Sequence, residues 1–471
     1  MPAALLFRQC RRQVLALFLS LLFVAIASSA TADDDATTDG AASGNTTTIR
    51  AAAAEVNITP TEPVYIVGPT GMSTGVADEL FARVLVIDDG NAPLAIVTCD
   101  LVGTGIPYAD ALRKSIEEVA GIPADRVMFN CSHTHNGPGA SLPADDSDKS
   151  YGRDVLKKIT AITAEAMKNL EPAVIRVGRE PCQIGFNRRL PTSDRVTMTV
   201  NPNGPVVPWV DVLAVYGENN KRIGILFSYA AHPVVIHSAS TLISGDYSGY
   251  AATHLGRMLQ ASPRKGGVMM FAQGCGGNIN AFPLKGGVDA ANRVGLVLAQ
   301  AVTRVQLQDV TPAPIVNASV ERALPFQDPL PLKEAEELLA TRPGDLRFQR
   351  LHKLAKDGPS PDMPFPLSGF AIGDEVCIIA LPHEMFCDYQ LWADKHSPYK
   401  QTFVFGYTNG VHGYVAAKKD LKMGLLRAGY GAEATPSRMP LKLESEAIVR
   451  DGISELWKKL DSAKDGSDTN E

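Results

Sequence analysis

The amino-acid sequence predicts an α/β protein, with a mixed β-sheet core and surrounding helices in a single large domain. Two observations support this prediction. Short apolar runs rich in β-branched residues alternate with stretches of helical periodicity, and the chain makes both strand-to-strand and strand-to-helix steps. The 471 residues are 45% hydrophobic and 20% charged, which is typical of a globular chain with enough apolar side chains for a sizeable core.

Apolar patterns and turn signals define the individual elements. Residues 82–88 and 94–99 are apolar runs separated by the turn sequence DGN, which predicts two neighbouring strands. Residues 151–170 carry apolar side chains at helical spacing and predict a long helix. By the same criteria, we expect strands over 127–131, 212–216, 223–229, 268–272, 377–381 and 402–405, and helices over 109–120, 247–259, 288–307 and 443–460.

Two segments interrupt this alternation. Residues 332–351 form a charged segment of helical character, and residues 358–366 are rich in proline. We expect an insertion or a lid there, because the strand pattern resumes directly afterwards.

The N-terminus predicts a cleaved signal peptide over residues 1–32. Three arginines precede the apolar run of residues 14–27, and the small residues Ala-Thr-Ala at 30–32 suit a signal peptidase. An uncleaved membrane anchor is the alternative, but the apolar run is shorter than the roughly 20 residues of a spanning helix. We therefore expect a secreted or periplasmic protein.

The remaining boundaries follow from composition. Residues 33–50 are small, polar and acidic, and cannot bury enough apolar surface to fold, so we expect a disordered leader. The domain itself is expected over residues 51–462, with a polar tail over 463–471.

Charge and cysteine content exclude several classes of protein. The formal charge of −6, without any basic block, offers no surface for phosphate backbones, so we expect no nucleic-acid partner. The cysteines of the domain are widely spaced and include no C-x-x-C pair, which argues against a disulfide framework or a thiolate zinc site. Most of them are expected to be buried thiols.

The sharpest local motif is CSHTHNGPG at residues 131–139. If His133 and His135 continue the strand that begins at Val127, the two-residue period puts both imidazoles on one face. They would then lie at the carboxyl end of the strand, where open α/β sheets place their sites. The pair could bind a metal together, or one could bind the metal while the other contacts substrate. Hydrogen-bonded histidines at a strand end are the alternative.

Three further polar motifs follow apolar, strand-like runs. They are AAHP at 230–233, LPHE at 381–384 and TNGVHGY at 408–414. Each brings His, Glu or Tyr to a strand end, and together with the first motif they predict one polar cleft.

Such a cleft suits metal-assisted hydrolysis. Zinc binds neutral imidazole and carboxylate groups, and a catalytic zinc site keeps one position open for water. The ion lowers the pKa of that water to about 7 and polarises a carbonyl, as amide cleavage at neutral pH requires. The glycine-rich sequence QGCGGN at residues 273–278 could add backbone N–H groups that stabilise an oxyanion, with an ordinary turn as the alternative.

Taken together, these motifs resemble the neutral (non-lysosomal) ceramidase family, specifically its N-terminal catalytic domain. The similarity runs from about residue 53 to residue 460. The motifs that carry it are AAEVNITPTEP at 53–63, SHTHNGPG at 132–139, FNRR at 186–189, AAHP at 230–233, SGDYSGYAA at 244–252, FAQGCGGNIN at 271–280, LPHE at 381–384 and NGVHGY at 409–414.

The resemblance implies a set of site residues. The implied ligands of a Zn2+ ion are His133, His232, Glu384 and Tyr414, with Tyr407 as the alternative to Tyr414. The resemblance also implies that His135 stabilises an oxyanion or supports the metal ligands without binding the metal itself. It implies further that Arg188 is a cation on the substrate side. The implied oxyanion or substrate loop contains Gly274, Cys275 and Gly276.

The chain departs from the family pattern in two ways. Gly274 stands where ceramidases carry a serine with a central catalytic part, and Asn278 stands where they carry an aspartate. Cys275 is adjacent and is an alternative nucleophile. In ceramidases a β-sandwich domain follows the catalytic domain; we expect no counterpart of it here, so ceramide is only one candidate substrate.

From these observations we expect an exported, zinc-dependent hydrolase. It would cleave the amide bond of an N-acyl compound, ceramide-like or a related lipid amide, by metal-activated water. Peripheral contact with a membrane would then come through the substrate. The alternatives are a zinc-dependent esterase or lactonase on the same scaffold, and a non-catalytic secreted binding protein, which the glycine at position 274 favours.

Overall fold

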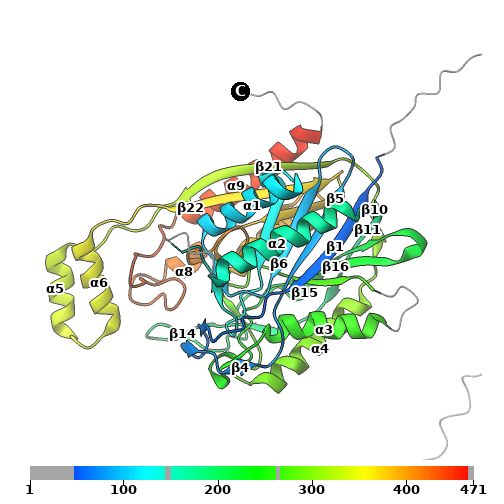
Figure 1. Ribbon diagram of the computed structural model, residues 1–471. Helices are drawn as coiled ribbons and strands as arrows, with labels where there is room; N and C mark the ends of the chain where they lie inside the picture. Colours follow the sequence, from blue (N-terminus) through cyan, green and yellow to red (C-terminus); the bar gives the residue numbers. More distant parts are fainter. Residues whose placement is uncertain (1–46, 144–149, 261–265, 465–471) are drawn as a thin grey trace, which may run out of the picture. The chain divides into compact units, whose positions relative to one another are not determined.

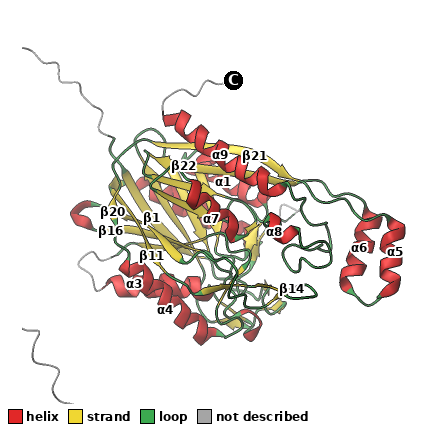
Figure 2. Ribbon diagram, turned by 180° about the vertical axis from the view of Figure 1, so that it is seen from behind, coloured by secondary structure: helices red, strands yellow, loops and turns green. Residues whose placement is uncertain are grey.

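Three β-sheets make up the core of the structure (Figures 1 and 2). The computed structural model describes residues 47–143, 150–260 and 266–464. The expected signal peptide therefore lies outside the described residues, as do most of the leader and of the tail. The mixture of parallel and antiparallel strands with covering helices confirms the expected fold class.

The first sheet has the strand order β10-β1-β5-β6-β8. Its strands are β10 (Glu171–Pro172), β1 (Arg50–Asn57), β5 (Phe81–Asp88), β6 (Leu94–Cys99) and β8 (Val127–Cys131). The pairs β1–β5 and β5–β6 are antiparallel, whereas β6 and β8 are parallel and are connected through α1 (Ile106–Ala120). Helices α1 and α2 (Tyr151–Lys168) cover its outer face.

The second sheet repeats this plan. Its order is β18-β16-β15-β11-β20, made of β18 (Val268–Gln273), β16 (Arg222–Tyr229), β15 (Trp209–Tyr216), β11 (Val174–Pro181) and β20 (Gln308–Asp309). Only β16 and β18 are parallel, and α3 (Asp246–Gln260) lies between them in the chain. Helices α3 and α4 (Val288–Arg304) cover its outer face.

The third sheet follows the plan with four strands. It contains, in order, β21 (Ile315–Leu324), β22 (Met363–Ile372), β23 (Val376–Ala380) and β25 (Gln401–Phe405). Here β23 and β25 are the parallel pair, connected through α7 (Cys387–His396). Helices α7 and α9 (Ser445–Lys464) pack on its outer face.

The inner faces of the three sheets meet in one apolar core, and the two-residue period of each strand divides its side chains between that core and the helices. On β5, Leu85 and Ile87 point into the shared core, while Val84 and Val86 pack among the side chains of the α1/α2 layer. Burial on both faces explains why these strands read as continuous apolar runs in the sequence.

Short strand pairs surround the carboxyl ends of the parallel strands. They are β2 (Tyr65–Ile66) with β3 (Gly71–Met72), β17 (Leu242–Ile243) with β4 (Gly75–Val76), β7 (Gly103–Thr104) with β9 (Gly139–Ala140), β12 (Gly185–Asn187) with β19 (Ile279–Ala281), β13 (Arg189–Pro191) with β14 (Val196–Met198), and β24 (Glu384–Met385) with β26 (Tyr414–Val415). A short helix, α8 (Lys418–Leu421), follows the last of them.

The segment expected to be an insertion forms a helical hairpin of α5 (Leu332–Thr341) and α6 (Leu346–Asp357), which stands at the ends of β21 and β22 (Figure 1). The proline-rich stretch is partly a strand, because β22 begins at Met363. Pro364 and Pro366 pair only with β21, and β23 joins β22 from Ser368 onward, so neither proline removes a hydrogen bond from a central strand. In the described part of the chain, no helix combines the length and apolar character needed to cross a membrane.

Candidate metal centre

The site forms where the three parallel strand pairs end. His133 and His135 follow β8, His232 follows β16, and Glu384 follows β23. Because each pair contributes its carboxyl end to the same edge, residues far apart in the sequence arrive at one place. The polar side chains of these motifs therefore come together at one edge of the fold, as the sequence predicted.

The route by which His133 reaches the site differs from the expectation. β8 ends at Cys131, and His133 has a φ of 66°, in the left-handed region that side chains other than glycine rarely adopt. The strand therefore does not extend through His133 and His135, and a tight turn, not strand alternation, brings their imidazoles together. The His133 N–H donates to the carbonyl of Leu101 at 3.0 Å and holds this turn.

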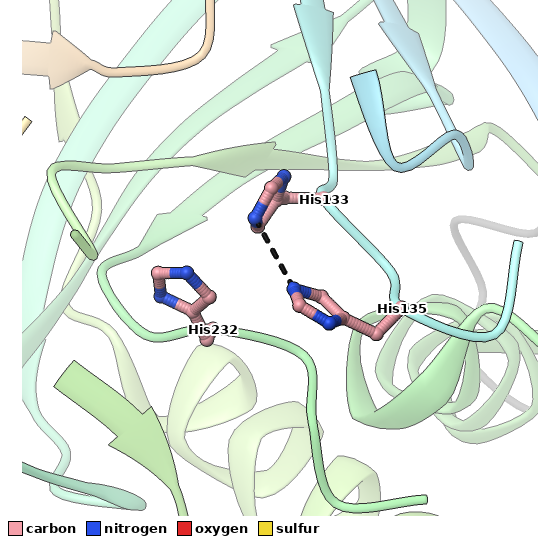
Figure 3. A group of neighbouring side chains, drawn as sticks. All are labelled: His133, His135 and His232. Carbon is pink, nitrogen blue, oxygen red and sulfur yellow. Dashed lines mark hydrogen bonds between the residues drawn. The ribbon is translucent and has the colours of Figure 1, made fainter. Parts of the chain in front are cut away.

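Three imidazoles converge at the centre (Figure 3), and the carboxylate of Glu384 joins two of them. Ring nitrogens of His133, His135 and His232 all lie within 4.8 Å of one another, and Nε2 of His133 is 3.3 Å from Nε2 of His135. Oε2 of Glu384 is 3.0 Å from Nε2 of His232 and 3.3 Å from Nε2 of His133. Two groups of three could thus bind a metal: the three histidines, or His133 and His232 together with Glu384. His133 and His232 belong to both groups.

The protein fixes the tautomer of two of the three imidazoles. Nδ1 of His133 donates to the carbonyl of Val102 at 2.6 Å, and Nδ1 of His232 donates to the carbonyl of Gly276 at 2.8 Å. A carbonyl can only accept, so the lone pair of each ring is on Nε2, which faces the centre. Nδ1 of His135 is buried and has no partner among the described residues. His133 and His232 are thus held as metal ligands usually are, and His135 is not.

Electrostatics keep these groups in the forms that bind a cation. Burial lowers the pKa of His232 to about 3, and Arg188 adds to the effect, so the imidazole is neutral at pH 7. Burial likewise lowers the pKa of His135. For Glu384, burial opposes ionisation, but His133 and His232 outweigh it and lower the pKa of the carboxyl group.

Tyr414 reaches the centre through the β24–β26 pair, in which it lies directly opposite Glu384. Its hydroxyl oxygen is 3.4 Å from Nε2 of His232. The alternative, Tyr407, is also at the site: its ring centroid is 4.5 Å from that of His133, and its buried hydroxyl has no partner in the described chain. Burial raises the pKa of both phenols. Both tyrosines therefore remain candidates.

Arg188 is enclosed by protein acceptors. Its guanidinium donates to Oδ1 of Asn280 at 3.0 Å, to the carbonyl of Gly277 at 2.7 Å and to the hydroxyl of Tyr414 at 3.0 Å. It also lies 3.3 Å from Nε2 of His232. These contacts make Arg188 a support for two of the candidate ligands and leave it little freedom to reach out to a substrate.

The glycine-rich loop also supports the site from behind. The N–H groups of Gly274, Cys275 and Gly276 donate to the carbonyl of Tyr229, to Oε1 of Gln390 and to the carbonyl of Gly274. With these three amides engaged, Gly274, Cys275 and Gly276 offer no free N–H donor for an oxyanion, and the Gly276 carbonyl instead orients His232. The oxyanion role predicted for this loop thus receives no support from its hydrogen bonds.

The position of the family serine is filled by another side chain. A Cβ atom at Gly274 would lie 2.8 Å from Oε1 of Gln390 and 3.1 Å from Cβ of Ala230, so no side chain fits there without movement. Cys275 is fully buried, and burial raises the pKa of its thiol, which keeps it protonated at neutral pH. This environment argues against Cys275 as a nucleophile.

Sequence reasoning missed the residue that joins the three sheets. The fully buried side chain of Asn130 donates to the carbonyls of Gln273 and Gly406, at 3.2 and 2.7 Å, and accepts from the N–H of Gln273 at 2.8 Å. These partners follow or end β18 and β25, so one amide links the ends of β8, β18 and β25. Its signal in the sequence is a lone polar residue inside an apolar strand, directly before the histidine motif.

Comparisons with known proteins agree with this picture. Residues 68–286 match the family model described as neutral/alkaline non-lysosomal ceramidase, N-terminal. A neutral ceramidase of Pseudomonas aeruginosa is 28% identical over 168 residues, which is 33% of this chain and 24% of that protein. The match thus spans about a quarter of the length of this curated relative.

Solved structures extend the likeness at the level of the fold. A crystal structure of neutral ceramidase from Pseudomonas aeruginosa aligns with a TM-score of 0.66 and 18% identity, over 90% of this chain and 76% of that one. A structure described as ceramidase complexed with C2 aligns with a TM-score of 0.65 and 17% identity, over 88% of this chain and 76% of that one. The resemblance predicted from the motifs is therefore confirmed: residues 68–286 match the model of the N-terminal part of the neutral/alkaline non-lysosomal ceramidases.

Proposed function

We propose that the protein is a metal-dependent hydrolase that cleaves the amide bond of an N-acyl compound. The observation that carries the proposal is the pair of imidazoles whose Nδ1 atoms are held by carbonyls, so that both Nε2 lone pairs face Oε2 of Glu384. Two neutral imidazoles and a carboxylate are the donor set that zinc prefers. The match to a ceramidase family model supports an amide of a lipid as the substrate class.

The ligand set we propose is His133, His232 and Glu384, with Tyr414 or Tyr407 as a fourth group. A divalent cation bound there supplies Lewis-acid polarisation of the scissile carbonyl and makes a nearby water more acidic. The burial of this set excludes bulk water and strengthens every charge interaction at the centre.

We assign proton transfer to His135. Its Nε2 faces the centre beside His133, and its Nδ1 has no fixed partner in the described structure. An imidazole held in this way can accept a proton at one nitrogen and release one from the other, which the locked rings of His133 and His232 cannot do without breaking their hydrogen bonds to carbonyls.

The test is a metal and substrate assay on the purified protein. We expect about one Zn2+ ion per chain, loss of N-lauroylethanolamine hydrolysis on treatment with a chelator, and recovery on addition of Zn2+. Hydrolysis that survives chelation would overturn the metal dependence, and failure to cleave any N-acyl amide would overturn the amidase.

A second substrate separates the remaining alternatives. The ester 2-hydroxyethyl laurate differs from N-lauroylethanolamine only at the scissile bond. Cleavage of the ester alone would identify an esterase, which the absence of a hydroxyl at position 274 favours. Zinc binding without cleavage of either compound would identify a binding protein.

Export is a separate part of the proposal and rests on the N-terminal sequence. The mature protein recovered from the producing cells should begin at Asp33, as mass spectrometry of the N-terminal peptide would measure. Recovery of a chain that retains residues 1–32 would contradict cleavage.

A further inference from the structure

A cavity of about 390 Å3 lies beside the candidate metal centre. It shares Tyr414 with the centre, and the hydroxyl of Tyr430 on its rim is 3.3 Å from the hydroxyl of Tyr414. Most of its wall is apolar and includes Phe326, Met363, Leu421, Ala432, Met439 and Leu441. A cavity of this size accommodates part of a small organic ligand, and its position suits the part next to the bond at the metal centre.

One charged side chain in this cavity has no counter-ion. Nη1 of Arg438 lies 3.7 Å from the sulfur of Met363, and its guanidinium carbon is 5.7 Å from the centroid of the Phe326 ring. No carboxylate of the described chain forms an ion pair with Arg438, and burial lowers the pKa of its guanidinium without an opposing acidic group. Arg438 is only partly buried, and its partial removal from water without a counter-ion is unfavourable, so an anion bound at this guanidinium would be stabilised.

The acidic residue nearest in the cavity wall is already paired. Glu433 lines the cavity, but its carboxylate is 3.0 Å from Nη2 of Arg195 and 3.9 Å from Nη1 of Arg350. The wall therefore carries an excess positive charge, which is located at Arg438. His412 adds a further hydrogen-bonding group, since its Nε2 is buried and has no partner among the described residues.

Arg438 is also close to the candidate ligands. A Cβ atom at Gly413 would lie 3.2 Å from Nη2 of Arg438, so the guanidinium rests directly on that residue. Gly413 precedes Tyr414, and its carbonyl accepts from the N–H of Glu384 at 2.9 Å. A substrate whose amide lies at the metal centre could thus place a nearby group against Arg438.

We propose that Arg438 binds a carboxylate of the substrate, so that the preferred substrates are N-acyl amino acids with an apolar side chain. The inference rests on the proposed function for the position of the scissile amide. The guanidinium would form bidentate, charge-assisted hydrogen bonds to the carboxylate, and the apolar wall would contact the amino-acid side chain.

Binding is measured with a matched pair of ligands on the zinc-loaded protein. N-dodecylsulfonyl-leucine and its leucinamide differ only in charge, and their sulfonamide resists hydrolysis. We expect the acid to bind about tenfold more tightly than the amide, as isothermal titration calorimetry would measure. Equal affinities in the wild-type protein would overturn the inference without any variant.

Substitutions test whether Arg438 causes the preference for the acid. Arg438→Gln should abolish the preference for the acid, and Arg438→Lys should keep part of it, because lysine retains the charge but not the planar fork. Arg427→Gln is the matched control: Arg427 lies in the same segment, but its guanidinium donates to the carbonyls of Asp194 and Ser193. A preference that survives in Arg438→Gln would contradict the assignment.

Hydrolysis of N-lauroyl-leucine and N-lauroyl-leucinamide separates this inference from the proposed function. If the protein discriminates between the two sulfonamides but cleaves neither lauroyl compound, the anion site stands and the amidase fails. If it cleaves both lauroyl compounds equally and binds both sulfonamides equally, the amidase stands and the anion site fails.

Discussion

The two halves of the site differ in how they relate to known proteins. The first two sheets supply His133, His135 and His232, and lie largely in the segment that matches the ceramidase family model. The third sheet and the segments after it supply Glu384, both tyrosines and the cavity with Arg438, and they lie outside the matched segment, within the part of the chain that aligns with the solved structures in fold. Under the proposed function, the histidine half would supply most of the chemistry, and the other half would set the specificity.

The largest expected effect tests whether both halves are needed to hold the ion. His232→Ala should reduce bound Zn2+ from about one per chain to a small fraction and reduce hydrolysis at least 100-fold, and Glu384→Ala should do the same. His254→Ala is a suitable control, because Nε2 of His254 forms its hydrogen bond with Oδ1 of Asn292 and not with a residue of the candidate centre. Full zinc retention in Glu384→Ala, measured by elemental analysis, would show that the histidine half suffices.

The next prediction concerns the hydrogen bonds by which Asn130 joins the sheets of the two halves. Asn130→Ala removes hydrogen bonds to the ends of β18 and β25, leaves the buried Gln273 N–H without a partner, and leaves the Gly406 carbonyl only its hydrogen bond from the Thr408 hydroxyl. We expect the free energy of unfolding to fall by about 4 kcal/mol, as urea denaturation would measure. A loss below about 1 kcal/mol would mean that the three sheets hold their register without this residue.

A third prediction concerns pH and the support behind the histidine turn. Asp78 accepts from the Ser244 hydroxyl and from the Gly245 N–H, and the Ser244 carbonyl accepts from Thr134 of that turn. Burial raises the pKa of Asp78 to about 6, and the hydrogen bonds only partly offset the effect. A raised carboxyl pKa contributes stability below pH 4, and this contribution is lost as the pH rises through about 6.

Asp78→Asn should therefore flatten the dependence of stability on pH between about 4 and 6 and raise the free energy of unfolding at pH 8, by at most about 3 kcal/mol. Urea denaturation at several pH values measures both quantities. Asp110→Asn, at an exposed residue paired with Arg113, should leave the profile unchanged. An identical slope in wild type and Asp78→Asn would exclude Asp78 as the source.

The smallest expected effect distinguishes the two tyrosines of the second half. Tyr414→Phe removes a hydroxyl bonded to Arg188, whereas Tyr407→Phe removes a buried hydroxyl without a partner. If Tyr414 is the fourth ligand, its variant should bind zinc about tenfold more weakly, and Tyr407→Phe should leave zinc affinity unchanged and stability unchanged or slightly higher. The reverse order in a zinc competition titration would assign the ligand to Tyr407.

The sequence predicted most of the regular structure, because strands buried on both faces and amphipathic helices leave strong periodic signals. β1 was not predicted as a separate strand, since its run of alanines carries little β-propensity. The left-handed turn at His133 escaped prediction because tertiary hydrogen bonds impose it, against the preference of the residue itself.

The site, too, could be predicted only where its residues leave a signal in the sequence. Strand ends bearing His, Glu or Tyr indicated a polar cleft suited to a metal, but the roles of Glu384 and Tyr414 as ligands came only through the family resemblance, because no spacing joins them to the histidines. The roles of Asn130 and Arg438 depend on which partners are present or missing around them in three dimensions. A sequence without its fold cannot reveal an unpaired guanidinium.

The convergence of three sheet edges has a consequence for how the protein matures. Glu384 and Tyr414 are synthesised after the histidines, so the proposed ligand set would be complete only once the C-terminal third of the chain has emerged and folded. Zinc would then bind last. Because it would bind only the folded state, it would stabilise the arrangement of all three sheets. Removal of the ion should therefore lower the melting temperature of the whole domain as well as abolish hydrolysis.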